Sequence, residues 1–276
     1  MSNRIVVKIG SNALTRPNGR LDVTRVSALV DQVAWLRSRG HEVILVSSGA
    51  VACGRSELKA SVVLQSREGS MVAPSGAEGG ASLSSVEQRQ LYSALGQVKL
   101  IGLYYDLFRE HGLHIGQVLT MKENFRPGEQ YQNQRACMTV MLENGVVPIV
   151  NENDTVAVTE LMFTDNDELS GLIARMMQAD VLILLSNIDG IYTGDPRDPQ
   201  SQLITTVQPG DDLSQFIKEE KSAFGRGGMH SKYTTARGVQ QAGIRVLIAN
   251  GEREHVLSQL IEHPENVPHT EFIACK

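Results

Sequence analysis

The chain has 276 residues, with 26 lysines and arginines against 31 aspartates and glutamates, so its formal net charge at pH 7 is −5. It has no surplus of cations to neutralise a nucleic-acid backbone, so we expect no nucleic-acid partner. The three cysteines lie far apart without a C-x-x-C pair, which argues against a disulfide framework or a zinc cluster. No signal-like region and no run of about 18 apolar residues occurs, so we expect a cytoplasmic protein without a membrane partner.

Apolar runs rich in β-branched residues alternate with segments of helical periodicity along the chain. The first run, residues 4–9, precedes turn residues and then a helix that Asp22 caps and Gly40 ends. Further strands are predicted at 42–48, 113–120, 146–150, 181–186 and 245–249, and helices at 86–109, 135–143, 168–177 and 231–241. The chain is short beyond the last predicted strand. Apolar strands separated by helices predict an α/β fold, a three-layer αβα sandwich with a mainly parallel central sheet.

The segment from Lys59 to Ser85 departs from this alternation, because it is rich in serine and glycine and contains no aromatic residue. Two interpretations are open: a mobile surface insertion, or a flexible lid over a site at the sheet edge. No internal repeat and no second regime of composition divides the chain. We therefore expect a single domain over residues 1–276 with a flexible insertion at about 59–85.

Two loops near the N-terminus follow predicted strands, where ligands bind in open α/β sheets. The first contains Lys8 and Gly10. A lysine in an apolar strand is costly to bury unless an anion meets it, although an edge-strand lysine can also extend to water. The second, VSSGA, offers the hydroxyls of Ser47 and Ser48 and backbone donors. A serine hydrolase is disfavoured because the G-x-S-x-G elbow and a histidine in a triad context are absent.

A third region holds two clusters of acidic and amide residues, at 151–154 and 165–167. Such groups suit hard cations and the ammonium of an amino acid. They also suit turns and caps, and Asp167 is a candidate cap for the helix that follows it. The spacing does not match an EF-hand loop.

A fourth region is the glycine-rich FGRGGMHSK at 224–232, which opens a predicted helix. Its backbone amides, the positive helix end and Lys232 together suit phosphate groups. Neither G-x-x-x-x-G-K-[ST] nor G-x-G-x-x-G matches it. The loop after the strand at 181–186 adds Ser186, Asn187 and Asp189, with a plain surface loop as the alternative. The seven histidines offer no metal-binding pair, and we expect no dedicated protein metal site.

Taken in order, these loops closely resemble the glutamate 5-kinase family of the amino acid kinase superfamily. The matching motifs are VVKIGSN, VSSGAVACGR, VPIVNENDTVA, TDNDELS, LLSNIDGIYTGDPR and GGMHSK, which span nearly the whole chain. The KIGS opening with NEND and DND resembles this branch more than the aspartate, acetylglutamate, uridylate or isopentenyl phosphate kinases. Many bacterial relatives carry a C-terminal PUA domain, and we expect none in residues 1–276.

The resemblance implies the amino acid kinase fold and transfer of the γ-phosphoryl group of ATP, with Mg²⁺, to the γ-carboxylate of L-glutamate. The product is L-glutamyl 5-phosphate, in the first step of proline biosynthesis. We also expect a homo-oligomer, because the helix around Tyr92 to Phe108 offers an apolar interface, and glutamyl phosphate reductase as a partner, because the acyl phosphate product reacts with water. Two alternatives stay open: a superfamily kinase with another acceptor, and a non-catalytic sensor of amino acid and nucleotide.

The resemblance also assigns roles to residues. Lys8 and Lys232 would contact the phosphoryl groups, with Asp167 holding both lysines in place. Glutamate would be bound by Ser48, Asp154 and Asn166. The nucleotide would be bound by Lys8, Ser186, Asn187, Arg226, Gly227, Gly228, Met229, His230, Ser231 and Lys232. Asn187 stands where the family often has aspartate, and Arg226 where a small polar residue is common.

The proposed chemistry agrees with the residue types. Phosphoryl transfer depends on positioning and charge neutralisation more than on covalent catalysis, and two lysines with glycine-loop amides provide both. The acceptor carboxylate, with a reference pKa of about 4.3, is already ionised at neutral pH, so no general base is needed.

Overall fold

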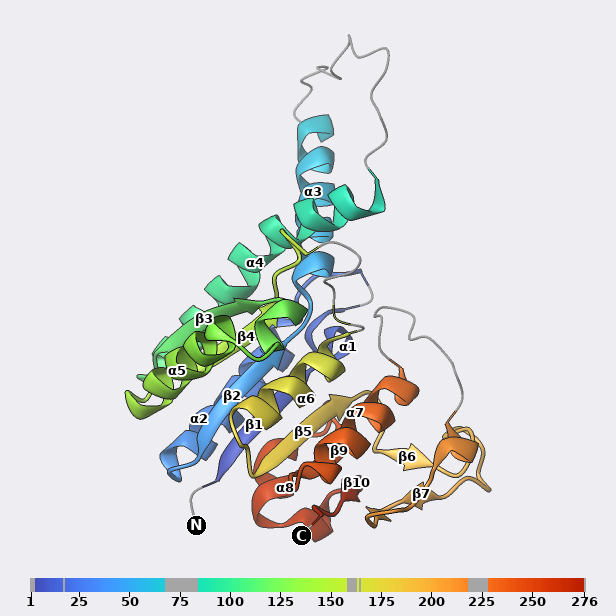
Figure 1. Cartoon of the computed structure of the whole chain (residues 1–276). Helices are drawn as coiled ribbons and strands as arrows, with labels where there is room; N and C mark the ends of the chain where they lie inside the picture. Colours follow the sequence, from blue (N-terminus) through green and yellow to red (C-terminus); the bar gives the residue numbers. More distant parts are fainter. Residues whose placement is uncertain are drawn as a thin grey trace.

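The protein is described by a computed structural model covering residues 3–16, 18–67, 84–157, 163, 165–217 and 228–275, without the side chains of residues 59–67. Its centre is an eight-stranded sheet with strand order β3-β4-β2-β1-β5-β9-β10-β8 (Figure 1). In that order the strands are Ile115–Thr120, Val147–Glu152, Glu42–Ser47, Arg4–Ile9, Val181–Ser186, Arg245–Asn250, His269–Phe272 and Thr206–Val207. Neighbouring strands are parallel except β9 and β10, which are antiparallel.

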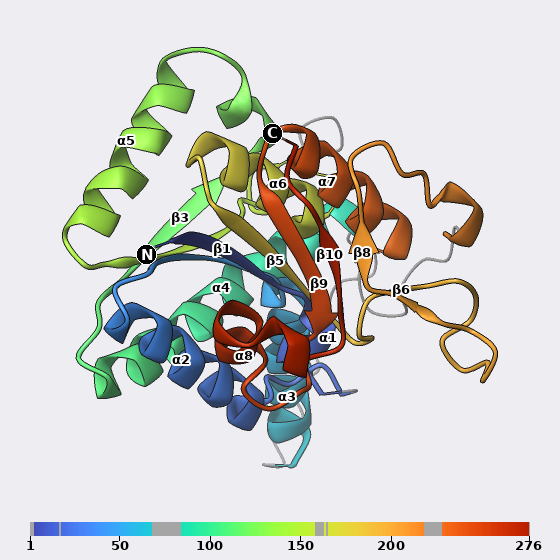
Figure 2. The same cartoon turned by 90° about the horizontal axis from the view of Figure 1, so that it is seen from below.

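Helices cover both faces of the sheet, which makes the three-layer αβα sandwich predicted from the sequence (Figure 2). One face packs against α2 (Val23–Ser38), α4 (Ser85–Glu110) and α8 (Val256–Glu262), and the other against α5 (Glu129–Glu143), α6 (Asn166–Met176) and α7 (Met229–Gln241). Strand β1 divides its side chains between the two cores, with Ile5 and Val7 on the first face and Val6 on the second. This alternation explains why Ile5, Val6 and Val7 are apolar in succession.

The remaining elements are short, apart from α3. They are α1 (Ser11–Leu14), α3 (Ala50–Arg67), the hairpin of β6 (Ile191–Tyr192) and β7 (Leu203–Ile204), and the 3₁₀ turns η1 (Lys122–Phe125), η3 (Ser214–Phe216) and η4 (Pro264–Asn266). Within the described residues, no helix combines the length and apolar character that crossing a membrane requires.

The predicted strands and long helices are confirmed, with four corrections. Helix α3 continues to Arg67, so residues 59–67 are helical where the sequence predicted no helix. The insertion itself stays a prediction, and residues 68–83 lie outside the described part of the chain. Helix α5 begins at Glu129 rather than near 135, and the turn after β1 contains α1. The chain is not short beyond β9, because α8 and β10 follow it. The single-domain organisation stays a prediction.

Helices α3 and α4 cross at two glycines, Gly54 and Gly96. A Cβ added to Gly54 would lie 1.8 Å from the carbonyl oxygen of Tyr92, and one on Gly96 would lie 1.8 Å from that of Ala50. Only glycine permits such direct contact between two backbones. The crossing joins α4, which starts beyond the carboxyl ends of the strands, to the segment that follows β2 (Figure 1).

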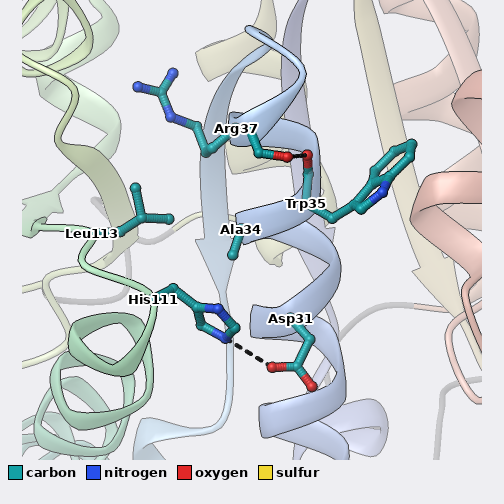
Figure 3. A pocket seen from close by; sticks show the side chains of 7 residues that line it. Asp31, Ala34, Trp35, Arg37, His111 and Leu113 are labelled. Atoms are coloured by element: carbon teal, nitrogen blue, oxygen red, sulfur yellow. Dashed lines mark hydrogen bonds and ion pairs between the residues drawn. The ribbon is translucent and has the colours of Figure 1, made fainter.

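A shallow surface pocket of about 430 Å³ lies between α2 and the end of α4, lined among others by Asp31, Trp35 and His111 (Figure 3). The imidazole Nε2 of His111 lies 2.8 Å from Oδ1 of Asp31. The lining residues lie at the ends of α2 and α4, in the segments that lead into β2 and β3. The pocket therefore belongs to the amino-terminal edge of the sheet, opposite the residues described next.

Candidate active site

The strand order brings the predicted site residues to the carboxyl-terminal edge of the sheet. Strands β4, β2, β1, β5 and β9 are consecutive neighbours and all parallel, so the segments that follow them leave from the same edge. Asp154 and Ser48 follow β4 and β2 on one side, and Ser186 ends β5 on the other. Lys8 lies between them, near the end of β1.

Lys8 and Lys232 meet at one carboxylate. The Nζ atom of Lys8 lies 2.7 Å from Oδ1 of Asp167, and Nζ of Lys232 donates to Oδ2 at 3.1 Å. The exposed fractions are 6% for Lys8, 9% for Lys232 and 0% for Asp167. Because β1 pairs with β2 and β5 on its two sides, the interpretation of Lys8 as an edge-strand lysine extending to water is wrong.

Asp167 lies in the first turn of α6 and is not the residue that caps this helix. The capping residue is Asp165, whose side chain accepts hydrogen bonds from the backbone N–H groups of Asp167 and Glu168 at 2.8 and 3.0 Å. The alternative interpretation of Asp167 as a cap is therefore wrong. Capping by Asp165 leaves the Asp167 carboxylate to the two lysines.

Burial and charge set the protonation of this group. Burial lowers the pKa of Lys8 below its usual value and nearby Lys232 lowers it further, while Asp167 acts in the opposite direction. Burial acts to raise the pKa of Asp167, but the ammonium groups of Lys8 and Lys232 outweigh it and hold that pKa below the ordinary 3.8. With both lysines protonated, the three groups carry one net positive charge in a buried position. A buried excess positive charge is costly in isolation and suits a bound anion.

Gly10 leaves space beside this charge. A Cβ at that position would lie 3.4 Å from the Nζ atom of Lys8, in van der Waals contact with it. The backbone turns there into α1 without a side chain between it and the ammonium.

Ser48 and Asn166 are in direct contact, as expected for two residues with a shared role. The Nδ2 group of Asn166 donates to Oγ of Ser48 at 2.7 Å and to Oδ1 of Asn151 at 3.2 Å. Asn166 immediately precedes Asp167, so this polar group adjoins the lysine pair along α6. Asn151, near the end of β4, was not among the predicted site residues, but it belongs to this polar group through its contact with Asn166.

Asp154 is joined to a residue that sequence reasoning missed, Arg89 of α4. The Nη2 atom of Arg89 donates to Oδ1 of Asp154 and, at 2.8 Å, to Oε2 of Glu152. Oγ of Ser93 lies 3.5 Å from the other oxygen of Asp154. Arg89 precedes Asp154 by 65 residues, on a helix in which the sequence predicted no site residue. No local pattern signals the contact, which depends on how α4 crosses the end of β4.

The opposite side of the edge contains the predicted nucleotide-binding residues. Ser186 ends β5, and its carbonyl accepts the backbone N–H of Gly251 at 2.8 Å, which joins the segments after β5 and β9. Asp189 and Arg253 reinforce this junction with two contacts of 2.6 and 2.8 Å. The Arg253 guanidinium, more than any other group, holds the pKa of Asp189 below its usual value.

Helix α7 supplies Lys232 and the residues before it. Gly228 is the N-cap residue and offers no side chain, so the first N–H groups of the helix are not capped by it. Met229, His230 and Ser231 form the turn that leads to Lys232. Arg226 and Gly227 lie outside the described residues. Among those that are described, no group of three His, Cys, Asp or Glu side chains is arranged to hold a metal ion.

Comparisons with known proteins agree with this architecture. Residues 3–250 match the amino acid kinase family. The chain is 57% identical to glutamate 5-kinase of Bacteroides thetaiotaomicron over 270 residues, which are 98% of this chain and 70% of that protein. The chain belongs to the glutamate 5-kinase branch of the amino acid kinase family. This kinase is also 40% identical over 263 residues to glutamate 5-kinase of Symbiobacterium thermophilum, covering 95% of this chain and 93% of that one.

Two solved structures share the fold of this kinase at low sequence identity. UMP kinase from Ureaplasma parvum superposes with a TM-score of 0.64 at 14% identity, over 99% of both chains. Carbamate kinase from Giardia lamblia bound to AMP-PNP superposes with a TM-score of 0.66 at 15% identity, also over 99% of both chains. These likenesses concern the fold alone.

Proposed function

We propose that this kinase transfers the γ-phosphoryl group of ATP to the γ-carboxylate of L-glutamate, giving L-glutamyl 5-phosphate in the first step of proline biosynthesis. The observation that carries the proposal is the buried contact of Lys8 and Lys232 with Asp167, midway along the functional edge of the sheet. Relatives named glutamate 5-kinase, at 57% and 40% identity, support the choice of substrate.

In this mechanism the two lysines lower the repulsion between the reactants. The γ-phosphoryl group and the glutamate carboxylate are both anionic and must approach to about 3 Å, where two unit charges at an effective dielectric near 20 repel by about 5 kcal/mol. Lys8 and Lys232 are fixed by Asp167 on one side and present their positive charge to the transferring group. Magnesium arrives with ATP as part of the substrate and adds positive charge on the phosphates.

The other site residues have different roles on the two sides of the carboxyl-terminal edge, with glutamate on one side and the nucleotide on the other. Asp154 receives the α-ammonium of glutamate, and Ser48 and Asn166 orient the substrate through their shared polar group. Ser186 and Asn187 contact the nucleotide, and the first turn of α7, from Gly228 to Lys232, directs N–H groups at the phosphates. The nucleotide contacts of Arg226 and Gly227 rest on the resemblance to the family.

A coupled assay of ATP consumption tests the proposal with glutamate, aspartate, N-acetylglutamate and UMP as acceptors. We expect turnover with glutamate and less than about one hundredth of that rate with the others, because a site that hydrogen-bonds its substrate rejects analogues strongly. Turnover with another acceptor instead would assign a different superfamily kinase. Binding of glutamate and ATP without phosphate transfer would assign the non-catalytic sensor.

We further propose that the enzyme is a homo-oligomer. Helix α4 exposes Leu91, Leu95, Val98 and Tyr105 on one face, at spacings that place them along a single stripe, and Val98 is 73% exposed. Packing α4 of a second copy along this stripe would remove the apolar surface from water. Light scattering should give a mass above that of one chain, and Val98→Asp should lower it; a monomeric wild-type protein would contradict the proposal.

Glutamyl phosphate reductase is proposed as a transient partner, since the acyl phosphate product reacts with water and benefits from direct transfer. Adding the reductase should raise the yield of reduced product above that of two enzymes separated by a membrane permeable to metabolites. The cytoplasmic location stays a prediction from the sequence.

A further inference from the structure

We propose that Arg89 is a positioning residue of the glutamate site, which balances the charge of Glu152 so that Asp154 can receive the α-ammonium of the substrate. The inference rests on the proposed function and adds two residues to it. Within the described residues, the cluster joins two carboxylates to one guanidinium. A free α-amino group carries the positive charge that a buried carboxylate binds.

The geometry of the cluster gives each carboxylate a separate task. One nitrogen, Nη2 of Arg89, contacts both acids, and the exposed fractions of the side chains are 20% for Arg89, 2% for Glu152 and 8% for Asp154. The other oxygen of Glu152, Oε1, accepts the backbone N–H of Phe163 at 3.0 Å. Glu152 is therefore committed to the protein, with one oxygen on Arg89 and one on the backbone.

Within the described residues, only one carboxylate oxygen of Asp154 has a close contact. Its Oδ1 accepts from Arg89, whereas Oδ2 has Oγ of Ser93 at 3.5 Å, the outer limit of a hydrogen bond. A charged ammonium makes a much stronger contact than a hydroxyl at that distance. Oδ2 is thus the carboxylate oxygen of the cluster best placed to receive the substrate.

The charge balance explains why the arginine is needed. Two adjacent buried carboxylates repel each other, and the guanidinium that contacts both offsets that repulsion. The substrate ammonium then adds a positive charge beside Asp154. An N-acylated glutamate brings no such charge to the buried carboxylates, which is costly. The cluster therefore selects acceptors with a free α-amino group.

The test uses steady-state kinetics of the full chain. Arg89→Gln should raise the KM for glutamate about 10- to 100-fold, the cost of stranding a buried charge, while kcat and the KM for ATP change less than about threefold. Adding Glu152→Gln to that variant should restore most of the glutamate KM, because it removes one negative charge and keeps Oε1 as the acceptor for Phe163. Arg89→Lys should stay within about fivefold of the wild type, since one ammonium nitrogen can replace Nη2. Arg109→Gln, an exposed position on the same helix, is the matched control and should change nothing.

Several results would overturn the inference while leaving the proposed function intact. One is an unchanged glutamate KM in Arg89→Gln. Another is a double variant no better than the single one, which would indicate that Arg89 touches the substrate itself. If a thermal melt shows that Arg89→Gln does not fold, the double variant and Arg89→Lys test the inference instead. A rise of more than tenfold in the glutamate KM of both variants would then contradict charge balancing. Failure of the proposed function is distinct, because the wild-type enzyme would then not phosphorylate glutamate at all.

Discussion

Replacing Lys8 by methionine removes one of the two ammonium groups while keeping an apolar stem of similar length in β1. Two anions at about 3 Å repel by about 5 kcal/mol, a cost that Lys8 shares with Lys232 and the magnesium of ATP. Loss of one preorganised donor to a developing charge typically costs about 3 to 4 kcal/mol, or 10²- to 10³-fold in kcat. Asp167 keeps Lys232 at 3.1 Å, so its carboxylate is not left without a cation and the fold should persist.

The assay is the coupled measurement of ATP consumption, with the glutamate KM and a thermal melt recorded on the same sample. Lys122→Met is a matched control, because Lys122 is 47% exposed and pairs at 2.9 Å with Glu168, the residue after Asp167. It should retain nearly full turnover. A Lys8→Met enzyme that keeps more than about a tenth of the wild-type kcat would refute the role given to Lys8.

Three further predictions follow from the structure. In Asp167→Asn the alkaline limb of the kcat/KM profile should lie at lower pH than in the wild type, because burial already lowers the pKa of Lys8 and Asp167 is the group that raises it most; an unmoved limb would count against the pairing. Gly54→Ala should lower Tm by at least about 3 °C, because its Cβ meets a carbonyl of α4 at 1.8 Å, whereas Gly102→Ala, with nothing within 4 Å, should not; equal Tm values would disprove the close crossing. Asp189→Asn should raise the KM for ATP about three- to tenfold by loosening the loops after β5 and β9, and a change in the glutamate KM alone would argue that these loops do not serve the nucleotide.

The central strands were predictable because both faces of the sheet are covered, which gives them apolar runs such as residues 5–7 of β1 and 181–185 of β5. The first residue of α6 was harder to predict, because Asp165 and Asp167 can both cap a helix and only the backbone conformation decides between them. No helix was predicted at residues 59–67, because the serine and glycine content of the longer segment concealed a helical stretch at its start. Propensity averaged over a mixed segment cannot locate such a boundary.

The residues of the site also include some that the sequence could predict and some that it could not. Lys8, Asp167 and Lys232 were identified through motif resemblance, and their meeting depends on parallel strands ending at one edge of the sheet. Arg89 was not predictable, because its partners Glu152 and Asp154 lie 63 and 65 residues away and are reached only through the crossing of α4 over β4. A long-range ion pair leaves no periodic signal in a single sequence.

The most direct test of the central claim is a crystal structure with ADP, aluminium fluoride, Mg²⁺ and glutamate, which together mimic the transferring phosphoryl group. The account predicts the Nζ atoms of both Lys8 and Lys232 within about 3 Å of the fluoride ligands, with Asp167 contacting both lysines. A complex in which the aluminium fluoride lies beyond the reach of either lysine, with the Asp167 contacts unchanged, would contradict it.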